Sequence, residues 1–202
     1  MTPSSDIAFS SSVKAVQERR GSRAAYARME EKGGFATAID QSLADFIESA
    51  RSFYLATANK DGQPYIQHRG GPPGFLRVLD AKTLAFADFT GNRQYITTGN
   101  LEDNPRAMMF LMDYANRRRV KIWGTARVVE NDPELIARLL PEGYRARAEA
   151  AILFNVEAWD VNCPQHIPQM LLAEDVAEMM RALGERIERL ESENARLRAG
   201  ST

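Results

Sequence analysis

Apolar and polar residues alternate most regularly between Arg119 and Val129. Small or apolar residues occupy every second position there, namely Val120, Ile122, Gly124, Ala126 and Val128. The positions between them carry Arg, Lys, Trp and Thr. A period of two is typical of a strand with one buried and one polar face. The segment is therefore predicted to be a long β-strand whose second face is open to solvent or to a ligand.

Several shorter segments are also rich in strand-forming residues. Two of them, SFYLATA at 52–58 and QPYIQH at 63–68, flank an Asp-Gly turn and predict a hairpin. The others are FLRVLD at 75–80, TLAFADF at 83–89, MMFLM at 108–112 and AILFNVEAWDVN at 151–162. The uninterrupted apolar run at 108–112 suggests a strand covered on both sides. Many short strands with few helices favour a mostly β fold with α insertions (α+β), built on a closed or nearly closed antiparallel barrel.

Helix-forming patterns lie outside these strands. Residues 13–32 are predicted to form one helix that ends at Gly33-Gly34, and 37–50 a second helix with Thr37 as its N-cap. Segments 92–101 and 133–140 would be short helical insertions, and the serine-rich residues 1–12 are expected to be disordered or loosely attached.

The C-terminal segment has a period of seven. Apolar residues and one asparagine alternate at spacings of four and three, at Val176, Met180, Leu183, Ile187, Leu190, Asn194 and Leu197. Leu at d with Ile and Asn at a favours a parallel two-stranded coiled coil. The flanking charges agree with it, because Arg186 would face Glu191 of the partner and Glu193 would face Arg198. A single amphipathic helix packed on its own barrel remains the alternative.

Composition limits the classes of function. With 202 residues and a net charge of −1, the chain is expected to form one domain (37–170) between an N-terminal tail and helix (1–36) and the C-terminal coil (171–202). The overall charge predicts neither a nucleic-acid partner nor a membrane partner. One cysteine, Cys163, and the lack of a membrane-spanning run predict a cytoplasmic protein. With Cys163 and two histidines only, no metal site is expected.

Two segments could hold an anion. The first, IQHRGGPPGFLRVLD at 66–80, places Gln67, His68 and Arg69 before glycines that permit close backbone approach, although such a segment taken alone is more often a plain connection. In the second, Asn92 is predicted to cap a helix with Arg93 and Gln94 in its first turn, which suits a phosphate. Alternatively, Arg93 only caps the loop or pairs with Asp88. The basic run NRRRVKIW at 116–123 is too short for a nucleic-acid surface.

The order of several motifs resembles that of the pyridoxamine 5′-phosphate oxidase family of flavoproteins over about residues 40–170. These motifs are GQPY at 62–65, GNRQ at 91–94, NLEDNPRAMMFL at 100–111 and an Arg-x-Val strand start at 118–120. HRGGPPGF at 68–75 and DVNCPQHIPQ at 160–169 resemble the broad FMN-binding branch, whose substrates are mostly unassigned. The resemblance implies a split β-barrel homodimer with FMN in clefts at the subunit interface.

The resemblance also implies which residues hold the flavin. Gln67, His68, Arg69 and Gly70 would contact its ring, ribityl chain or phosphate, and Asp88 would line the cofactor. Asn92, Arg93 and Gln94 would contact the phosphate. Arg119 would contact the edge of the isoalloxazine ring. Trp159 and Asn162 of the C-terminal strand would close the site. His68 is the candidate for proton transfer, with a purely structural hydrogen bond as the alternative.

Departures from the true oxidase narrow the expected function. Gly71 and Gln94 stand where that enzyme has phosphate-binding lysines, and the C-terminal arginine and histidine that grip pyridoxal phosphate are absent. Vitamin B6 oxidation is therefore not predicted. The expectation is FMN-dependent redox chemistry on an unidentified small molecule with a nicotinamide electron donor. A non-catalytic flavin-binding or flavin-sensing dimer, or a barrel that binds heme or a deazaflavin, is the alternative.

Overall fold

The computed structural model describes residues 2–161 and 163–199. These residues form two compact units, one made of the chain up to Asp113 with Arg118–Pro164, the other of Tyr114–Arg117 with the chain from Gln165 onward. The elements of the first unit are η1 (Ser4–Ile7), α1 (Ser11–Arg19), α2 (Arg23–Glu31), α3 (Gln41–Ser49), β1 (Ser52–Ala58), β2 (Pro64–Gly70), β3 (Leu76–Val78), β4 (Thr83–Phe89), α4 (Ile96–Asp103), β5 (Arg106–Asp113), β6 (Arg118–Val129), α5 (Pro133–Leu139) and β7 (Ala148–Val161). The second unit holds α6 (Ala173–Ala199).

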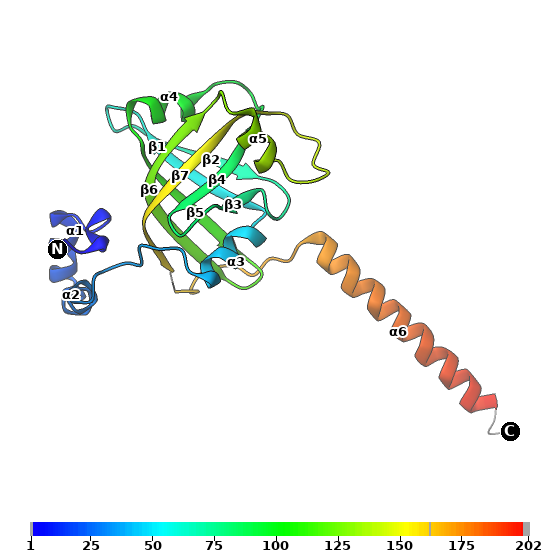
Figure 1. Ribbon diagram of the computed structural model, residues 1–202. Coiled ribbons are helices and arrows are strands. Elements are labelled where there is room, and N and C mark those ends of the chain that lie inside the picture. Colours follow the sequence, from blue (N-terminus) through cyan, green and yellow to red (C-terminus); the bar gives the residue numbers. More distant parts are fainter. Residues whose placement is uncertain (1, 162, 200–202) are drawn as a thin grey trace. The chain divides into compact units, whose positions relative to one another are not determined.

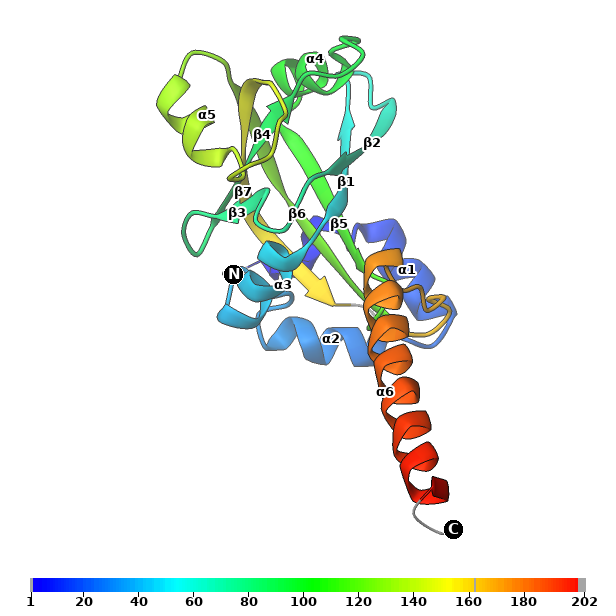
Figure 2. The same cartoon turned by 90° about the vertical axis from the view of Figure 1, so that its right-hand side faces the viewer.

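All seven strands belong to one antiparallel sheet of order β2-β1-β5-β6-β7-β4-β3. Figures 1 and 2 show the sheet curling into a barrel, with α4 and α5 at one end and α3 at the other. The edge strands β2 and β3 do not pair with each other, so the barrel is split. The predicted α+β class with an antiparallel split barrel is therefore confirmed.

The core follows from the alternation of side chains along the strands. Inward positions of β1, β5 and β6 are fully buried, as Leu55, Met109 and Ile122 show, and α3 adds Leu43 and Ile47 at the open end of the barrel. The outer face of β4 and β7 is covered by α5, so Ala85 and Ala151 are buried as well.

The outer face of β5 corrects one expectation. The run at 108–112 suggested a strand covered on both sides, but only Met109 and Leu111 are fully buried. Met108, Phe110 and Met112 point outward and stay half-exposed. An apolar strand face is thus left open in the single chain.

Three helix boundaries differ from the sequence predictions, each for a local reason. Residues 13–32 form two helices rather than one, because Gly21 has a φ of +78° and interrupts the hydrogen-bonded spiral between α1 and α2. The helix predicted from Thr37 begins at Gln41, since the side chain of Asp40 accepts a hydrogen bond from the backbone N–H of Leu43 and acts as the N-cap. The insertion predicted at 92–101 becomes helical only from Ile96.

Residues 2–12 are ordered and packed against the rest of the chain, contrary to the prediction for this segment. Ser4 donates side-chain hydrogen bonds to the carbonyls of Gly33 and Phe35, and Ser5 is fully buried. Phe35 stacks in parallel on Trp123 of β6, at 5.3 Å between ring centroids. The N-terminal segment therefore packs against the outer face of the sheet.

Ion pairs hold η1, α1 and α2 together. Lys14 lies 2.6 Å from Asp6 and 3.2 Å from Glu30, and Glu30 also pairs with Arg23. The hydrogen bond from Arg23 is the main cause that lowers the pKa of Glu30 below its usual 4.5.

Strands β6 and β7 approach each other very closely at Gly124. The pairing of β6 with β7 shifts register between Trp123 and Gly124. A Cβ atom at position 124 would lie 1.9 Å from the backbone oxygen of Asn155, so no other residue fits without moving β7.

Gly124→Ala should therefore destabilise the barrel by about 3 kcal/mol or more, since the added methyl meets backbone rather than a side chain that can rotate. Thermal unfolding of the variant measures this. Gly99→Ala is the matched control, because nothing lies within 4 Å of the added Cβ in α4 and alanine favours a helix. Equal melting temperatures for the two variants would contradict the role given to Gly124.

The pKa of Glu30 predicts an acid-sensitive N-terminal segment. A carboxylate whose folded pKa is lowered contributes stability above its unfolded pKa and loses it as the pH falls through the folded value. Below about pH 4.5, amide hydrogen exchange in α1 and α2 should therefore accelerate more than in the barrel strands. Glu30→Gln should remove this pH dependence, whereas Glu31→Gln, at an exposed neighbour, should leave it intact.

Candidate functional site

Strand β2 presents different residues on its two faces. Gln67 and Arg69 pair with Leu55 and Phe53, which point into the barrel, so they point to the interior side as well. His68 pairs with Tyr54 on the outer face and is exposed. Because side chains alternate along a strand, His68 cannot share a face with Gln67 and Arg69.

The loop after β4 has an unusual backbone. Arg93 has a φ of 60° and Tyr95 a φ of 52°, both in the left-handed region. The side-chain oxygen of Asn92 accepts a hydrogen bond from the N–H of Gln94 at 3.3 Å. Asn92 therefore closes a local turn instead of capping a helix, and Arg93 and Gln94 precede α4 rather than forming its first turn.

Helix α4 is fixed to the sheet by two polar contacts. Thr97 donates a hydrogen bond to Gln67 of β2 at 2.7 Å, and the buried amide of Asn100 donates to Thr57 of β1 at 3.0 Å. These contacts hold the first turn of α4 against the end of β2 that carries Gln67 and Arg69.

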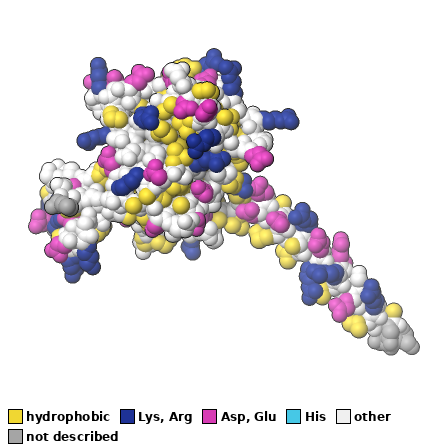
Figure 3. Space-filling view, viewed as in Figure 1, with side chains coloured by type: hydrophobic (Ala, Val, Ile, Leu, Met, Phe, Trp, Pro, Cys, Tyr) yellow, Lys and Arg dark blue, Asp and Glu magenta, His cyan; other side chains and the backbone are white. Residues whose placement is uncertain are grey.

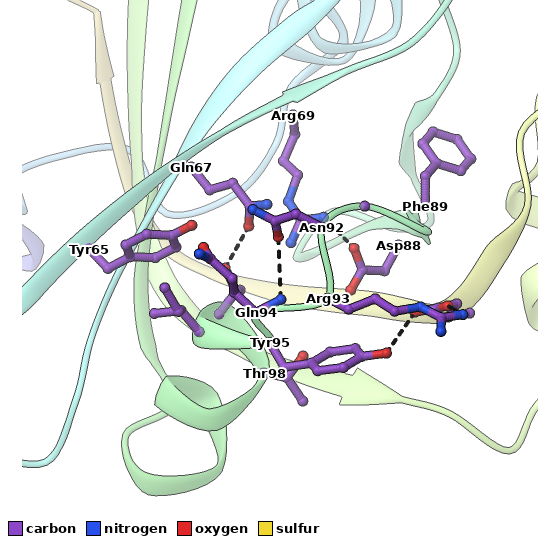
Figure 4. Close-up of a pocket in the computed structure, with 14 residues that line it drawn as sticks. Tyr65, Gln67, Arg69, Asp88, Phe89, Asn92, Arg93, Gln94, Tyr95 and Thr98 are labelled. Carbon is purple, nitrogen blue, oxygen red and sulfur yellow. Dashed lines mark hydrogen bonds and ion pairs between the residues drawn. The ribbon is translucent and has the colours of Figure 1, made fainter.

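β2, the end of β4, the following loop and the start of α4 enclose a small cavity (Figure 4). Its volume is about 50 Å³. The lining includes Gln67, Arg69, Asp88, Asn92, Arg93, Gln94, Tyr95, Thr97 and Glu149. Gln67 and Arg69 of β2 are therefore brought next to Asp88 and residues 92–94, which lie farther along the chain.

Each arginine of the cavity is paired with a carboxylate. Arg69 of β2 donates to Asp88 of β4 across the split in the barrel and lies over the ring of Phe86. Arg93 lies 3.2 Å from Glu149 of β7. The alternative that Arg93 pairs with Asp88 is therefore wrong, because Arg69 occupies that carboxylate. The four charges cancel, so the cavity carries no net charge.

Hydrogen-bond donors nevertheless remain available. The Nε atom of Arg69 is buried and has no hydrogen-bond partner in the described part of the chain. No side chain caps the N-terminus of α4, whose first residues line the cavity. The first N–H groups of a helix have no partner within it and form its positive end. These donors suit an anionic group such as a phosphate.

The other residues implied by the resemblance lie elsewhere. His68 and Arg119 are on the outer face of the sheet, and the buried Nε of Arg119 lacks a hydrogen-bond partner among the described residues. Gly70 ends β2 beyond the cavity lining. The indole N–H of Trp159 donates to the carbonyl of Ala38 at 2.8 Å and so anchors the segment before α3. Asn162 lies outside the described residues, and roles for these five in a flavin site remain predictions.

Some cavity residues were not predicted from the sequence. Glu149 and Tyr95 were missed, although the Tyr95 hydroxyl lies 3.4 Å from Glu149 and near the Arg93 ion pair. Thr97 was missed as well. Glu149 comes from β7 and meets Arg93 only through the fold, so no local motif identifies it.

The glycines of the 66–80 segment serve packing. A Cβ at Gly71 would lie 2.7 Å from the ring of Phe75, which stacks on Phe53 in the core. The N–H of Gly74 donates to the carbonyl of Glu48 at 2.7 Å. Thus only Gln67 and Arg69 of this segment belong to the cavity, while the glycines let the connection lie against α3.

A second, wider cavity of about 700 Å³ lies between η1 and the outer face of the sheet, with Ala56, Met108 and Trp123 among its lining residues. It contains none of the residues implied by the resemblance. Within residues 2–161 and 163–199, no group of three or more His, Cys, Asp or Glu side chains could hold a metal ion. No helix in the same part of the chain is long and apolar enough to cross a membrane.

Solved structures with this fold are similar over most of their length. HupZ from Group A Streptococcus is 22% identical, with a TM-score of 0.51, covering 66% of this chain and 99% of its own. A putative pyridoxamine 5′-phosphate oxidase from Lactobacillus delbrueckii is 20% identical, with a TM-score of 0.49 and coverages of 62% and 95%. An FMN-binding protein from Syntrophomonas wolfei is 11% identical, with a TM-score of 0.48 and coverages of 72% and 97%.

A sequence model of a protein family assigns the chain to that family. No curated protein sequence matches the chain. The model described as pyridoxamine 5′-phosphate oxidase matches residues 39–163, which is more than half of the chain and includes every strand of the barrel. With its split barrel and the order of its motifs, the chain belongs to the pyridoxamine 5′-phosphate oxidase family.

Proposed function

We propose that this protein binds FMN and uses it for the redox conversion of an unidentified small molecule, with a nicotinamide as electron donor. The observation that carries the proposal is the convergence of Arg69, Arg93 and the uncapped start of α4 on one small cavity. Family membership supports a flavin as the bound group, and the Syntrophomonas protein of this fold is an FMN-binding protein. Bound FMN would supply hydride and electron transfer.

The residues present fit a phosphate at the cavity. Arginine binds phosphate through two parallel hydrogen bonds, and this geometry compensates for the lysines that the chain lacks at Gly71 and Gln94. The partner-free Nε of Arg69 and the first amides of α4 provide further donors. Phosphate binding would draw Arg69 from Asp88 and Arg93 from Glu149.

A single chain does not enclose a whole flavin. The cavity of about 50 Å³ is far below the roughly 300–1,000 Å³ of small-molecule pockets, so it can take a phosphate but not the ring system. The half-exposed apolar side chains on the outer face of β1 and β5, among them Tyr54, Met108 and Phe110, offer a surface for a second chain. Both observations support a homodimer in which the flavin lies at the subunit interface.

The roles of His68 and Arg119 follow from their position on the outer face. Both residues would hold the flavin ring from this face, at the proposed dimer interface. There, the guanidinium of Arg119 would stabilise negative charge on the reduced ring, and His68 would hold or pass a proton.

Visible spectroscopy of the purified protein separates this proposal from its alternatives. An oxidised-flavin spectrum supports FMN, whereas a Soret band identifies heme and a deazaflavin spectrum identifies that cofactor. A colourless protein that does not take up added FMN rules the proposal out. Reduction of bound FMN by a nicotinamide, followed by reoxidation with small-molecule acceptors, distinguishes an enzyme from a non-catalytic flavin-binding dimer.

Arg93→Ala and Glu149→Gln should change FMN affinity in opposite directions. Loss of the guanidinium removes a charge-assisted hydrogen bond and should weaken binding about 10- to 100-fold. Glu149→Gln should tighten binding, because Arg93 would no longer be paired with a carboxylate. Fluorescence titration with FMN measures both, and Arg77→Ala, at an exposed position of β3 outside the cavity, is the control. An unchanged affinity in Arg93→Ala would remove the proposed phosphate contact.

His68→Asn tests the proton-transfer role. The variant should keep the proposed phosphate contacts, since His68 does not line the cavity, and should lower the turnover number about 100-fold or more if the imidazole transfers a proton. Wild-type turnover would leave His68 with a structural role only.

A further inference from the structure

Helix α6 exposes a continuous apolar seam. Its 27 residues, Ala173–Ala199, extend for about 40 Å at 1.5 Å per residue, and none of them is buried. Met180, Leu183 and Ile187 are 63%, 58% and 55% exposed. Figure 3 shows hydrophobic side chains along this helix, interspersed with charged ones. An isolated helix of this kind is marginal in water and leaves apolar surface hydrated.

We propose that α6 pairs with α6 of a second copy of this chain as a parallel two-stranded coiled coil. The structure makes 173–199 one unbroken helix, so the seven seam positions from Val176 to Leu197 lie on one side of it. Asn194 occupies an a position, where a parallel dimer places it against Asn194 of the partner helix and satisfies both amides. Leu183 and Leu190 at d positions favour two strands.

Charge complementarity selects the second copy as the occupant. In a parallel dimer, Arg186 at g faces Glu191 at e of the other helix, and Glu193 faces Arg198. Each pair occurs twice by symmetry. Neither Arg186 nor Glu191 has an oppositely charged residue three or four positions away on its own helix. Their charges therefore have their complement on a second helix rather than on their own.

The two halves of α6 contribute differently to the proposed coiled coil. In the first half, the e and g positions hold Ala177, Met179 and Gly184, which carry no charge. The apolar face is broader there, and Met179 is 50% exposed. Orientation and register are therefore set by the last two heptads, which contain Asn194 and both charge pairs, whereas the first half adds apolar contact.

Pairing of α6 would also serve the interfacial flavin site, and this step rests on the proposed function. Two chains joined by a coil hold their barrels at an effective concentration in the millimolar range. The interface between the barrels would then stay formed in dilute protein. In a chain ending at Gln169, FMN binding should depend on protein concentration, whereas in the full chain it should not.

Disulfide cross-linking tests the pairing and its direction in the full-length chain. In a Cys163→Ser background, Leu183→Cys and Leu197→Cys should each form a dimer through their own counterparts, because equivalent d positions are adjacent in a parallel coil. Ser192→Cys, on the outer side of the helix, is the control and should not. Cross-linking only when the Leu183→Cys and Leu197→Cys chains are mixed would show an antiparallel pair and overturn the proposal, as would no cross-linking at all.

Charge exchange tests the register. Arg186→Glu or Glu191→Arg alone should slow cross-linking through Leu183→Cys severalfold, and the two together should restore it. Equal rates in all three would overturn the assigned contacts. Failure of the flavin proposal is distinguishable, because cross-linked dimers would then form without binding FMN. FMN binding without any cross-linking would instead overturn the coiled-coil proposal and leave the flavin proposal standing.

Discussion

The close approach of β6 and β7 at Gly124 is the constraint on which the barrel depends. These two strands are the longest in the sheet, with 12 and 14 residues, and their register shifts where the backbone oxygen of Asn155 occupies the space of a side chain. Curling brings β2 opposite β4, where Arg69 reaches Asp88 across the split. The cavity exists because that curl brings the end of β2 to the start of α4.

The strands of the barrel could be predicted from the sequence because their side-chain pattern is local. Alternation in 119–129 identified β6, and the Asp-Gly turn identified the β1–β2 hairpin. Helix starts were less accurate, since they depend on which of several polar residues caps the helix. Asp40, not Thr37, makes that hydrogen bond in α3. The left-handed backbone of Tyr95 has no sequence signature, so the start of α4 was misplaced.

The candidate site shows what a motif can identify and what requires the fold. Motif order singled out Gln67, Arg69, Asp88 and residues 92–94, which line one cavity. The strand period alone places His68 on the opposite face from Gln67 and Arg69, a conclusion that was available from the sequence. The role of Glu149 could not be predicted from the sequence, because its contact with Arg93 spans 56 residues and depends on the pairing of β4 with β7. Because Arg69 and Arg93 are already paired with carboxylates, an anion that binds them would have to replace Asp88 or Glu149 as their partner.

The position of β7 in the sheet has a consequence for folding during synthesis. β7 is the last strand in the sequence, yet it lies between β6 and β4. Before it emerges, the chain can form only two separate sheets, β2-β1-β5-β6 and β3-β4, and each has an unpaired edge. About 60 residues separate the end of β4 from β7, and a ribosome needs roughly 3–12 s to add them. During that interval the nascent chain exposes the edge of β4, and once β6 is complete at Val129 it exposes the edge of β6 as well; the final strand then joins both edges into one barrel.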